Sequence, residues 1–207
     1  MNFDLTEEQQ ALLELSNQIF EGSSPSDRVE EIETTEDRFD RDLWKELANA
    51  NILGVAIPEE HGGLGFGIFE LCLVLEQQGR TVAPVPLLPT LVMGALPIVE
   101  FGTTEQQSRL LPAIASGKCI VTGGFQEWGA NNPLDTSLEA QCKDGQWTLN
   151  GAKPAIPAAH IADYLVVPAK TDAENTHLFL IEREATGLTV TTNITTNREL
   201  QSQIDCD

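Results

Sequence analysis

The sequence predicts an α+β protein in which a helical half comes first and a half of antiparallel strands follows. Two observations lead to this prediction. Up to about residue 118, apolar residues recur three and four positions apart, as on one face of a helix. Beyond that point they alternate or form short β-branched runs between turn residues. We therefore expect an N-terminal all-α domain over residues 1–118 and an antiparallel β-barrel or β-sandwich domain over residues 119–207.

The net charge of the chain limits the classes of partner that it is expected to bind. Its 207 residues include 12 basic and 32 acidic ones, which gives a net charge of −20. Such a chain has no basic face for nucleic acid or for an anionic membrane surface. The longest apolar stretch, residues 87–99, is short and interrupted by Pro89 and Pro97, so no membrane span is expected. No targeting signal opens the chain, and we expect a cytoplasmic protein.

Acidic residues cluster between Asp27 and Asp42. This cluster fits a solvated loop or helix face, and it equally fits a docking surface for a basic partner. The sequence does not choose between the two.

Helix signals define the first half. Thr6 and Gln9 form a capping box, in which the threonine hydroxyl caps a backbone N–H and the glutamine reaches back. Leu71, Cys72 and Leu75 are expected on the inner face of a later helix. Further helices are expected over residues 40–50, 68–79, 87–101 and 103–117. Gly117 suits the position after the last of these helices.

Strand signals define the second half. Asp144-Gly145 predicts a hairpin turn, and Asn150-Gly151 predicts a second turn. Residues 164–169 and 178–181 are expected as buried strands. Strands are also expected over residues 119–122, 137–143, 146–149 and 188–192. The strand pattern still continues at residues 204–207, and folded proteins normally cover an open edge. We therefore expect an incomplete β half, which is either a piece of a longer chain or covered by a partner.

Metal and phosphate chemistry find little support in the sequence. The four cysteines (Cys72, Cys119, Cys142 and Cys206) are widely spaced, which favours free, mostly buried thiols. The three histidines (His61, His160 and His177) show no metal-ligand spacing, so no metal is expected. The glycine-rich run 62–65 follows no clear strand and lacks the lysine of a phosphate loop, which favours a structural turn. The three tryptophans, Trp44, Trp128 and Trp147, are expected in core or interface packing.

Several strings, in order along the chain, resemble the acyl-CoA dehydrogenase family. They are FDLTEEQ at residues 3–9, LGVAIPEEHGGLG at 53–65, FGTTEQ at 101–106 with Leu111-Pro112 and Gly117, WTLNGAK at 147–153, and Ala162-Asp163 with VPAKT at 167–171. Each string alone is weak, but their shared order covers essentially the whole chain.

The resemblance implies a helical domain, a middle β domain and a C-terminal helical bundle, of which this chain has the first two. In the family the bundle supplies the glutamate that removes the α-proton of an acyl-CoA while a hydride passes to FAD. No carboxylate in this chain matches that glutamate. The resemblance therefore assigns no catalytic residue here.

The family's two flavin-binding strings are altered in this chain. The first corresponds to residues 125–133, where Glu127, Gly129 and Ala130 keep the family pattern. Gln126, Trp128, Asn131 and Asn132 stand where threonine, proline, glycine and serine are usual. The second corresponds to residues 155–158, where an aromatic wall and a hydroxyl are missing and Pro157 has no backbone N–H. The candidate FAD-binding residues are Phe125, Gln126, Asn131, Asn132, Ala155 and Pro157.

These departures leave several interpretations open. The fold can still bind FAD through backbone groups, or the chain can be the degenerate subunit of a heteromer with FAD held mainly by its partner. Strings 79–90 and 157–163 resemble the heteromeric branch that acts on steroid side-chain CoA thioesters. The expected partners are an acyl-CoA and a homologous dehydrogenase subunit, or further copies of this chain.

Two further functions remain as alternatives. One is a non-catalytic subunit that stabilises a partner and completes its active site without binding FAD. The other is an acidic binding protein with no flavin. Arg80 and Lys153 are either contacts for a CoA phosphate or solvated surface bases.

Overall fold

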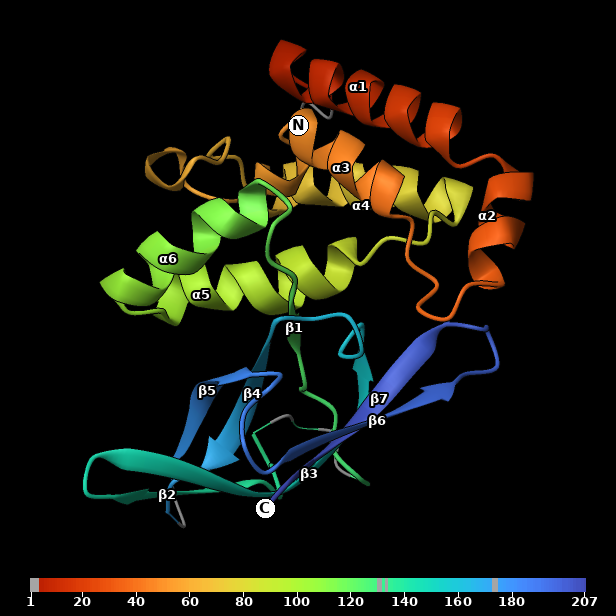
Figure 1. Cartoon of the computed structure of the whole chain (residues 1–207). Coiled ribbons are helices and arrows are strands. Elements are labelled where there is room, and N and C mark those ends of the chain that lie inside the picture. The colour runs from red at the N-terminus through yellow and green to blue at the C-terminus, as the bar shows by residue number, and fades with distance from the viewer. Residues whose placement is uncertain (1–3, 130–131, 133, 173–174) are drawn as a thin grey trace.

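The computed structural model describes residues 4–129, 132, 134–172 and 175–207. In these ranges a layer of helices lies on one side and a curled sheet on the other (Figure 1). The helices are α1 (Glu7–Ser23), α2 (Ser26–Glu33), α3 (Arg41–Asn49), η1 (Ile52–Gly54), η2 (Glu59–His61), α4 (Ile68–Thr81), the π-helix η3 (Leu88–Ala95), α5 (Leu96–Phe101) and α6 (Thr104–Ala115). The strands are β1 (Val121–Gly123), β2 (Glu139–Lys143), β3 (Gln146–Pro157), β4 (Tyr164–Lys170), β5 (Thr176–Glu182), β6 (Leu188–Ile194) and β7 (Leu200–Cys206).

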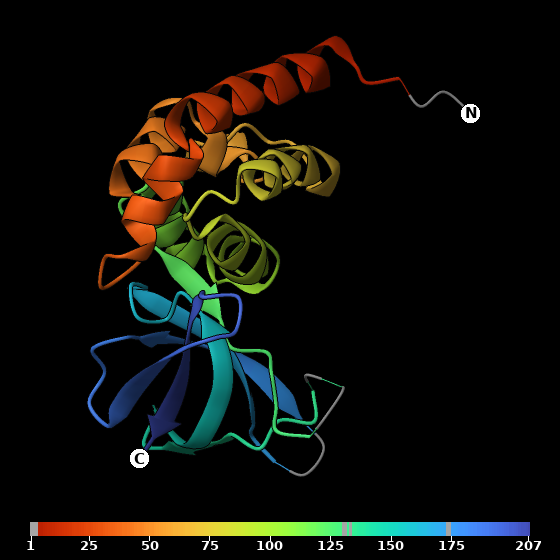
Figure 2. The same ribbon diagram turned by 90° about the vertical axis from the view of Figure 1, so that its right-hand side faces the viewer.

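The predicted α+β class is confirmed, and the sheet is mixed rather than purely antiparallel. Its strand order is β1-β4-β2-β3-β7-β6, with β5 also paired to β4. β1 runs parallel to β4, because both strands begin at the end of the sheet that faces the helical layer. The long strand β3 pairs first with β2 and then with β7, so that the sheet curls into a half-barrel (Figure 2).

Capping residues start the helices where the sequence predicts. Thr6 Oγ1 accepts a hydrogen bond from the backbone N–H of Gln9, 3.2 Å away, and the Gln9 side chain accepts one from the Thr6 N–H. Thr103 and Gln106 repeat this arrangement at α6. Gly117 follows α6 with φ of +69°, a conformation that glycine adopts without steric cost.

The acidic run between Asp27 and Asp42 is partly structural. It contains helix α2, which the sequence analysis missed, and the N-cap of α3. Asp40 is 1% exposed, accepts hydrogen bonds from the N–H groups of Asp42 and Leu43, and pairs with the Arg28 guanidinium at 2.8 and 3.0 Å. Burial alone raises the pKa of Asp40, but the hydrogen bonds from Arg28 and the backbone outweigh burial and hold this pKa below its ordinary value.

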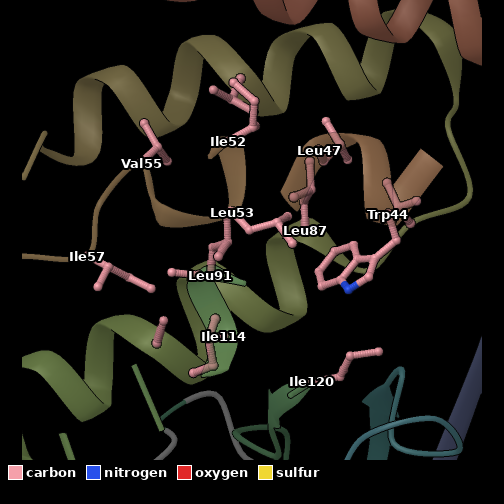
Figure 3. Close-up of a cluster of buried hydrophobic side chains, with 14 of the residues drawn as sticks. Trp44, Leu47, Ile52, Leu53, Val55, Ile57, Leu87, Leu91, Ile114 and Ile120 are labelled. Atoms are coloured by element: carbon pink, nitrogen blue, oxygen red, sulfur yellow. The ribbon is translucent and has the colours of Figure 1, made fainter. Parts of the chain in front are cut away.

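Two apolar cores form: a larger one fills the helical layer and extends to Val121 on β1 and Val166 on β4, and a smaller one lies inside the sheet. Figure 3 shows the helical core, where Trp44, Leu53 and Ile114 converge from different elements. The Trp44 indole N–H donates to the carbonyl of Gly117 at 3.0 Å, so even this buried ring has its polar atom paired. A smaller core inside the curled sheet includes Ile156.

The apolar segment predicted as one helix over residues 87–101 is divided into η3 and α5. η3 packs directly on β1. A Cβ added at Gly94 would lie 2.7 Å from the carbonyl oxygen of Val121, and one added at Gly123 would lie 2.8 Å from the carbonyl oxygen of Met93. The two backbones can approach this closely only because both positions are glycine.

Several local predictions are wrong. Cys72 points to solvent, because the buried face of α4 follows Leu71 and Val74, one residue out of phase with it. Cys142 is exposed as well, so two of the four free thiols are buried, rather than most of them. Asn150-Gly151 is no turn, because β3 continues through it and changes partner there from β2 to β7.

One further prediction about burial also needs correction. The strand predicted over residues 178–181 forms β5, but it is only partly buried, since among the described strands it pairs with β4 alone. Of the three tryptophans expected in core or interface packing, Trp44 lies in the core, while Trp128 and Trp147 are exposed and their packing in an interface stays a prediction. The predicted Asp144-Gly145 hairpin turn is confirmed, with positive φ at both residues as in a type I′ turn.

No helix among the described residues is long and apolar enough to cross a membrane.

Substitution of Gly94 tests the contact between η3 and β1. We expect Gly94→Ala to lower the free energy of unfolding by about 1–3 kcal/mol, because the new methyl group meets the Val121 backbone. Urea denaturation followed by circular dichroism measures this change. Gly79→Ala is the matched control, since nothing lies within 4 Å of its Cβ and alanine favours α4. Equal stability of the two variants would contradict the tight contact.

The lowered pKa of Asp40 predicts a pH-dependent contribution to stability. We expect Asp40→Asn to keep the α3 cap but lose the charge that pairs with Arg28. The stability gap to the wild type should be full above the ordinary carboxyl pKa of about 4 and shrink as the pH falls through the lowered pKa of Asp40. Urea midpoints from pH 7 to pH 3 measure it, with the exposed Asp42→Asn as control. A gap that is independent of pH would refute this account.

Candidate functional site

The residues that lead into the first predicted flavin string contact the second string at one edge of the sheet, beside the helical layer. The Thr122 hydroxyl on β1 donates a 2.6 Å hydrogen bond to the carbonyl of Pro157 at the end of β3. Next to it, Gly124 packs so tightly on β3 that an added Cβ would lie 2.8 Å from Ile156 Cδ1. The segment after β1 and the end of β3 are 30 residues apart in sequence but in direct contact.

A bulge shapes the β3 side of this edge. The register between β3 and β7 shifts between Lys153 and Ile156, and Ala155 within the shift has φ of +50°. This conformation is uncommon for a residue other than glycine, and the surrounding structure must enforce it. The Ala155 side chain is exposed. Bulges of this kind redirect a strand next to functional sites.

The six predicted FAD-binding residues differ in their burial and in their contacts at this edge. Phe125 is half-buried and its ring packs against Gly123, while Pro157 is half-buried with its carbonyl bonded to Thr122. Gln126, Asn132 and Ala155 are exposed, and Asn131 lies outside the described residues. The structure thus brings Phe125, Ala155 and Pro157 to one edge. The cofactor role of all six remains a prediction.

The sequence analysis missed an ion pair behind this edge. Lys153 is 0% exposed, and its ammonium group pairs with the carboxylate of Glu127, whose side chain is 2% exposed. Lys153 Nζ also donates to Thr136 Oγ1 at 2.7 Å. The prediction of Lys153 as a surface base or a CoA-phosphate contact is therefore wrong. Both residues were visible in the family-like strings, but nothing in a linear sequence pairs them.

Glu127 is held ionised by its neighbours. Its carboxylate accepts hydrogen bonds from the Ser137 hydroxyl at 3.0 Å and from the Ser137 N–H at 3.3 Å. Burial by itself raises the pKa of Glu127, but the hydrogen bonds, above all the one from Lys153, outweigh burial and hold this pKa below its ordinary value. Burial lowers the pKa of Lys153, and the hydrogen bond and charge of Glu127 oppose this shift. The pair lies just inside the predicted flavin edge.

Two hollows lie elsewhere on the molecule. One, of about 420 Å³, lies between α6, β4 and β5 and mixes bases such as Arg109 and Arg183 with acids such as Glu182. Cys119 also lines this hollow, and burial raises the pKa of its thiol to about 12. The other, of about 370 Å³, lies between α1 and α4 and contains Arg80. Neither hollow is lined by residues of the two flavin strings.

Metal binding finds no support in the described part of the chain, where no three His, Cys, Asp or Glu side chains come together as ligands. The glycine-rich run 62–65 forms a tight turn, in which an added Cβ at Gly63 would lie 2.0 Å from the carbonyl oxygen of Ile57. This contact leaves no room for a side chain.

Comparison with known proteins assigns this helical layer and curled sheet to a family. A sequence model of the acyl-CoA dehydrogenase N-terminal domain matches residues 6–118, and the chain belongs to the acyl-CoA dehydrogenase family. Acyl-CoA dehydrogenase FadE27 of Mycobacterium tuberculosis is 33% identical over 95% of this chain and 51% of its own length. Isovaleryl-CoA dehydrogenase of Solanum tuberosum is 34% identical over 72% of this chain and 38% of its own.

Solved structures agree with this assignment. A chain from a variant of the Tcur3481-Tcur3483 steroid ACAD is 41% identical with a TM-score of 0.91, over 97% of this chain and 55% of its own. A chain of the ChsE4-ChsE5 complex from Mycobacterium tuberculosis is 31% identical with a TM-score of 0.92, over 100% of this chain and 56% of its own. The chain thus spans about half the length of FadE27 and of these two solved chains.

Thiol reactivity tests the burial of the four cysteines. We expect Cys72 and Cys142 to react with a chromogenic disulfide reagent at pH 8 within minutes, because both are exposed. Cys119 and Cys206 should react only on unfolding, since both are buried and burial raises the pKa of each thiol. Mass spectrometry of the labelled peptides identifies the sites. Rapid labelling of Cys119 in the folded protein would contradict the packing between α6 and β4.

Proposed function

We propose that the chain forms the N-terminal domain (1–118) and the middle domain (119–207) of a subunit in a heteromeric, FAD-dependent acyl-CoA dehydrogenase. In this proposal the assembly acts in the cytoplasm and introduces an α,β double bond into a CoA thioester of a steroid side chain or of another bulky acyl group. The base that removes the α-proton is assigned to none of the acids in this chain. It would come from a C-terminal segment or from the partner subunit.

One observation carries this proposal. The 41% identity over 97% of the chain links it to a steroid ACAD whose description names two components. A chain from the structure described as the Tcur3481-Tcur3483 steroid ACAD matches at only 23% identity. A single amino-acid substitution cannot account for that difference in sequence identity, so the two matches are to unlike chains. We infer that this chain corresponds to one component of such a pair.

The residues at the sheet edge are compatible with one flank of a flavin site. Gln126 presents an exposed side-chain amide, and the neighbouring indole of Trp128 is 68% exposed. FAD, when bound, would supply the hydride acceptor. Gln126 can hydrogen-bond to a ring or phosphate oxygen, and Trp128 can provide a flat apolar surface. Because the Pro157 carbonyl is already bonded to Thr122, this position offers the cofactor little, which favours shared binding with a partner.

The alternative is a non-catalytic subunit that completes a partner's site without binding FAD. The altered string at residues 125–132 favours this alternative, because Gln126 and Asn132 replace the usual hydroxyl groups. Flavin binding separates the two possibilities.

We therefore predict where flavin will be found. The chain alone should retain little FAD after gel filtration, and its complex with a homologous dehydrogenase subunit should retain stoichiometric FAD, measured by absorbance near 450 nm. Gln126→Ala should weaken FAD binding by the complex about five- to tenfold, because the variant loses one hydrogen bond to FAD that contributes about 1 kcal/mol. Gln141→Ala on β2, exposed and outside both strings, is the control.

Either of two results would overturn this function. A complex without flavin would favour the non-catalytic subunit. Stoichiometric flavin on the isolated chain would remove the need for a shared site.

A further inference from the structure

In its described residues, the segment that joins β1 to β2 makes few backbone–backbone hydrogen bonds. At its start the Gly124 N–H donates to the Val166 carbonyl at 2.9 Å, and near its end the Leu138 N–H donates to Thr136 Oγ1 at 3.1 Å. Between these anchors, the backbone bond described is a local one, from Asp135 N–H to the Asn132 carbonyl. Yet this segment carries four of the six predicted flavin positions.

Side chains replace the missing backbone bonds. Glu127 lies early in the segment and reaches Ser137, ten residues later, through both its N–H and its hydroxyl. Glu127 also pairs with Lys153 on β3. Lys153 donates to Thr136, whose hydroxyl in turn donates to the Pro168 carbonyl on β4 at 3.0 Å. One network therefore closes the segment into a loop and fixes this loop to two strands.

The burial of Lys153 makes this arrangement obligatory. An ammonium group without a partner in the interior is costly, so Lys153 requires the Glu127 carboxylate inside the fold. With Glu127 turned inward, its two neighbours Gln126 and Trp128 are both exposed. The ion pair thus decides which side chains of the segment face outward.

We propose that Lys153 and Glu127 are positioning residues, which hold the described parts of the segment, residues 125–129 and 134–138, in place before the flavin arrives. The identity of the ligand rests on the proposed function, whereas the ordering does not. Replacing a buried ion pair by uncharged residues is often neutral for stability, whereas removing one partner is costly. The main contribution of the pair is therefore the shape of the segment and not the stability of the fold.

The double variant Lys153→Met/Glu127→Gln tests this proposal without leaving a charge unpaired. We expect its melting temperature to stay within a few degrees of the wild type. Amide hydrogen exchange over residues 125–138 should be about tenfold faster, and exchange over β4 should be unchanged, because only the local opening becomes easier. In the complex with its partner subunit, FAD should bind about tenfold more weakly, and the absorption band of bound flavin near 450 nm should change shape.

Two controls sharpen the test. Arg198→Met/Glu33→Gln removes another ion pair, of 2.8 Å, which joins the turn between β6 and β7 to α2. This variant should leave both the amide exchange over residues 125–138 and the FAD affinity unchanged. The single variant Lys153→Met should lower the melting temperature more than the double variant does, because Glu127 is then buried without its partner.

The outcomes separate the two claims. Unchanged exchange over residues 125–138 in the double variant would overturn the proposal. Faster exchange throughout the β half with a lower melting temperature would show a merely structural pair and would overturn it as well. If the wild-type complex binds no FAD, the proposed function fails, while the exchange data still decide whether the ion pair orders the segment.

Discussion

The close approach of η3 to β1 is the contact on which the rest of the arrangement depends. Two glycines, Gly94 on η3 and Gly123 on β1, let a helix backbone lie directly on a strand backbone. This contact joins the helical layer to the sheet and sets where β1 ends. Because the predicted flavin string starts at Phe125, two residues after β1 ends, the position of its start relative to the helices follows from this packing. The link between Asp37 and His160, whose Nε2 lies 2.9 Å from the Asp37 carbonyl, adds a second tie between the layers.

The sheet edge combines two kinds of rigidity. At β3 the backbone itself is constrained, because Ala155 adopts a left-handed conformation within a bulge. In the described part of the opposing segment backbone–backbone hydrogen bonds are few, and buried side chains supply the constraint through Glu127 and Lys153. Main-chain strain on one side and a buried charged network on the other both cost folding free energy, and they lie close together. The residues of neither feature line the two hollows.

The sequence predicted those features that depend on local chemistry. The capping box at Thr6, the helix that begins after Thr103 and the Asp144-Gly145 turn are encoded within a few residues, and the structure confirms them. The errors concern non-local contacts. Asn150-Gly151 has the composition of a turn, but β3 exchanges partners there, which depends on strands far away in sequence. Lys153 looks like a surface base until Glu127, 26 residues earlier, is brought against it by the fold. The parallel pairing of β1 with β4 is likewise a property of topology.

An altered flavin string remains compatible with the proposed site. Among the described residues of the first string, the departures from the family pattern fall at Gln126, Trp128 and Asn132, which are exposed, whereas Glu127 keeps the pattern and its side chain is buried. Exposed positions can change without disturbing the fold, since substitutions there seldom cost much stability. A subunit that shares its cofactor with a partner would lose outward contacts first and retain the inner anchor that shapes the segment. The described residues of the first string follow that order, which is what the proposed sharing of FAD with a partner subunit requires.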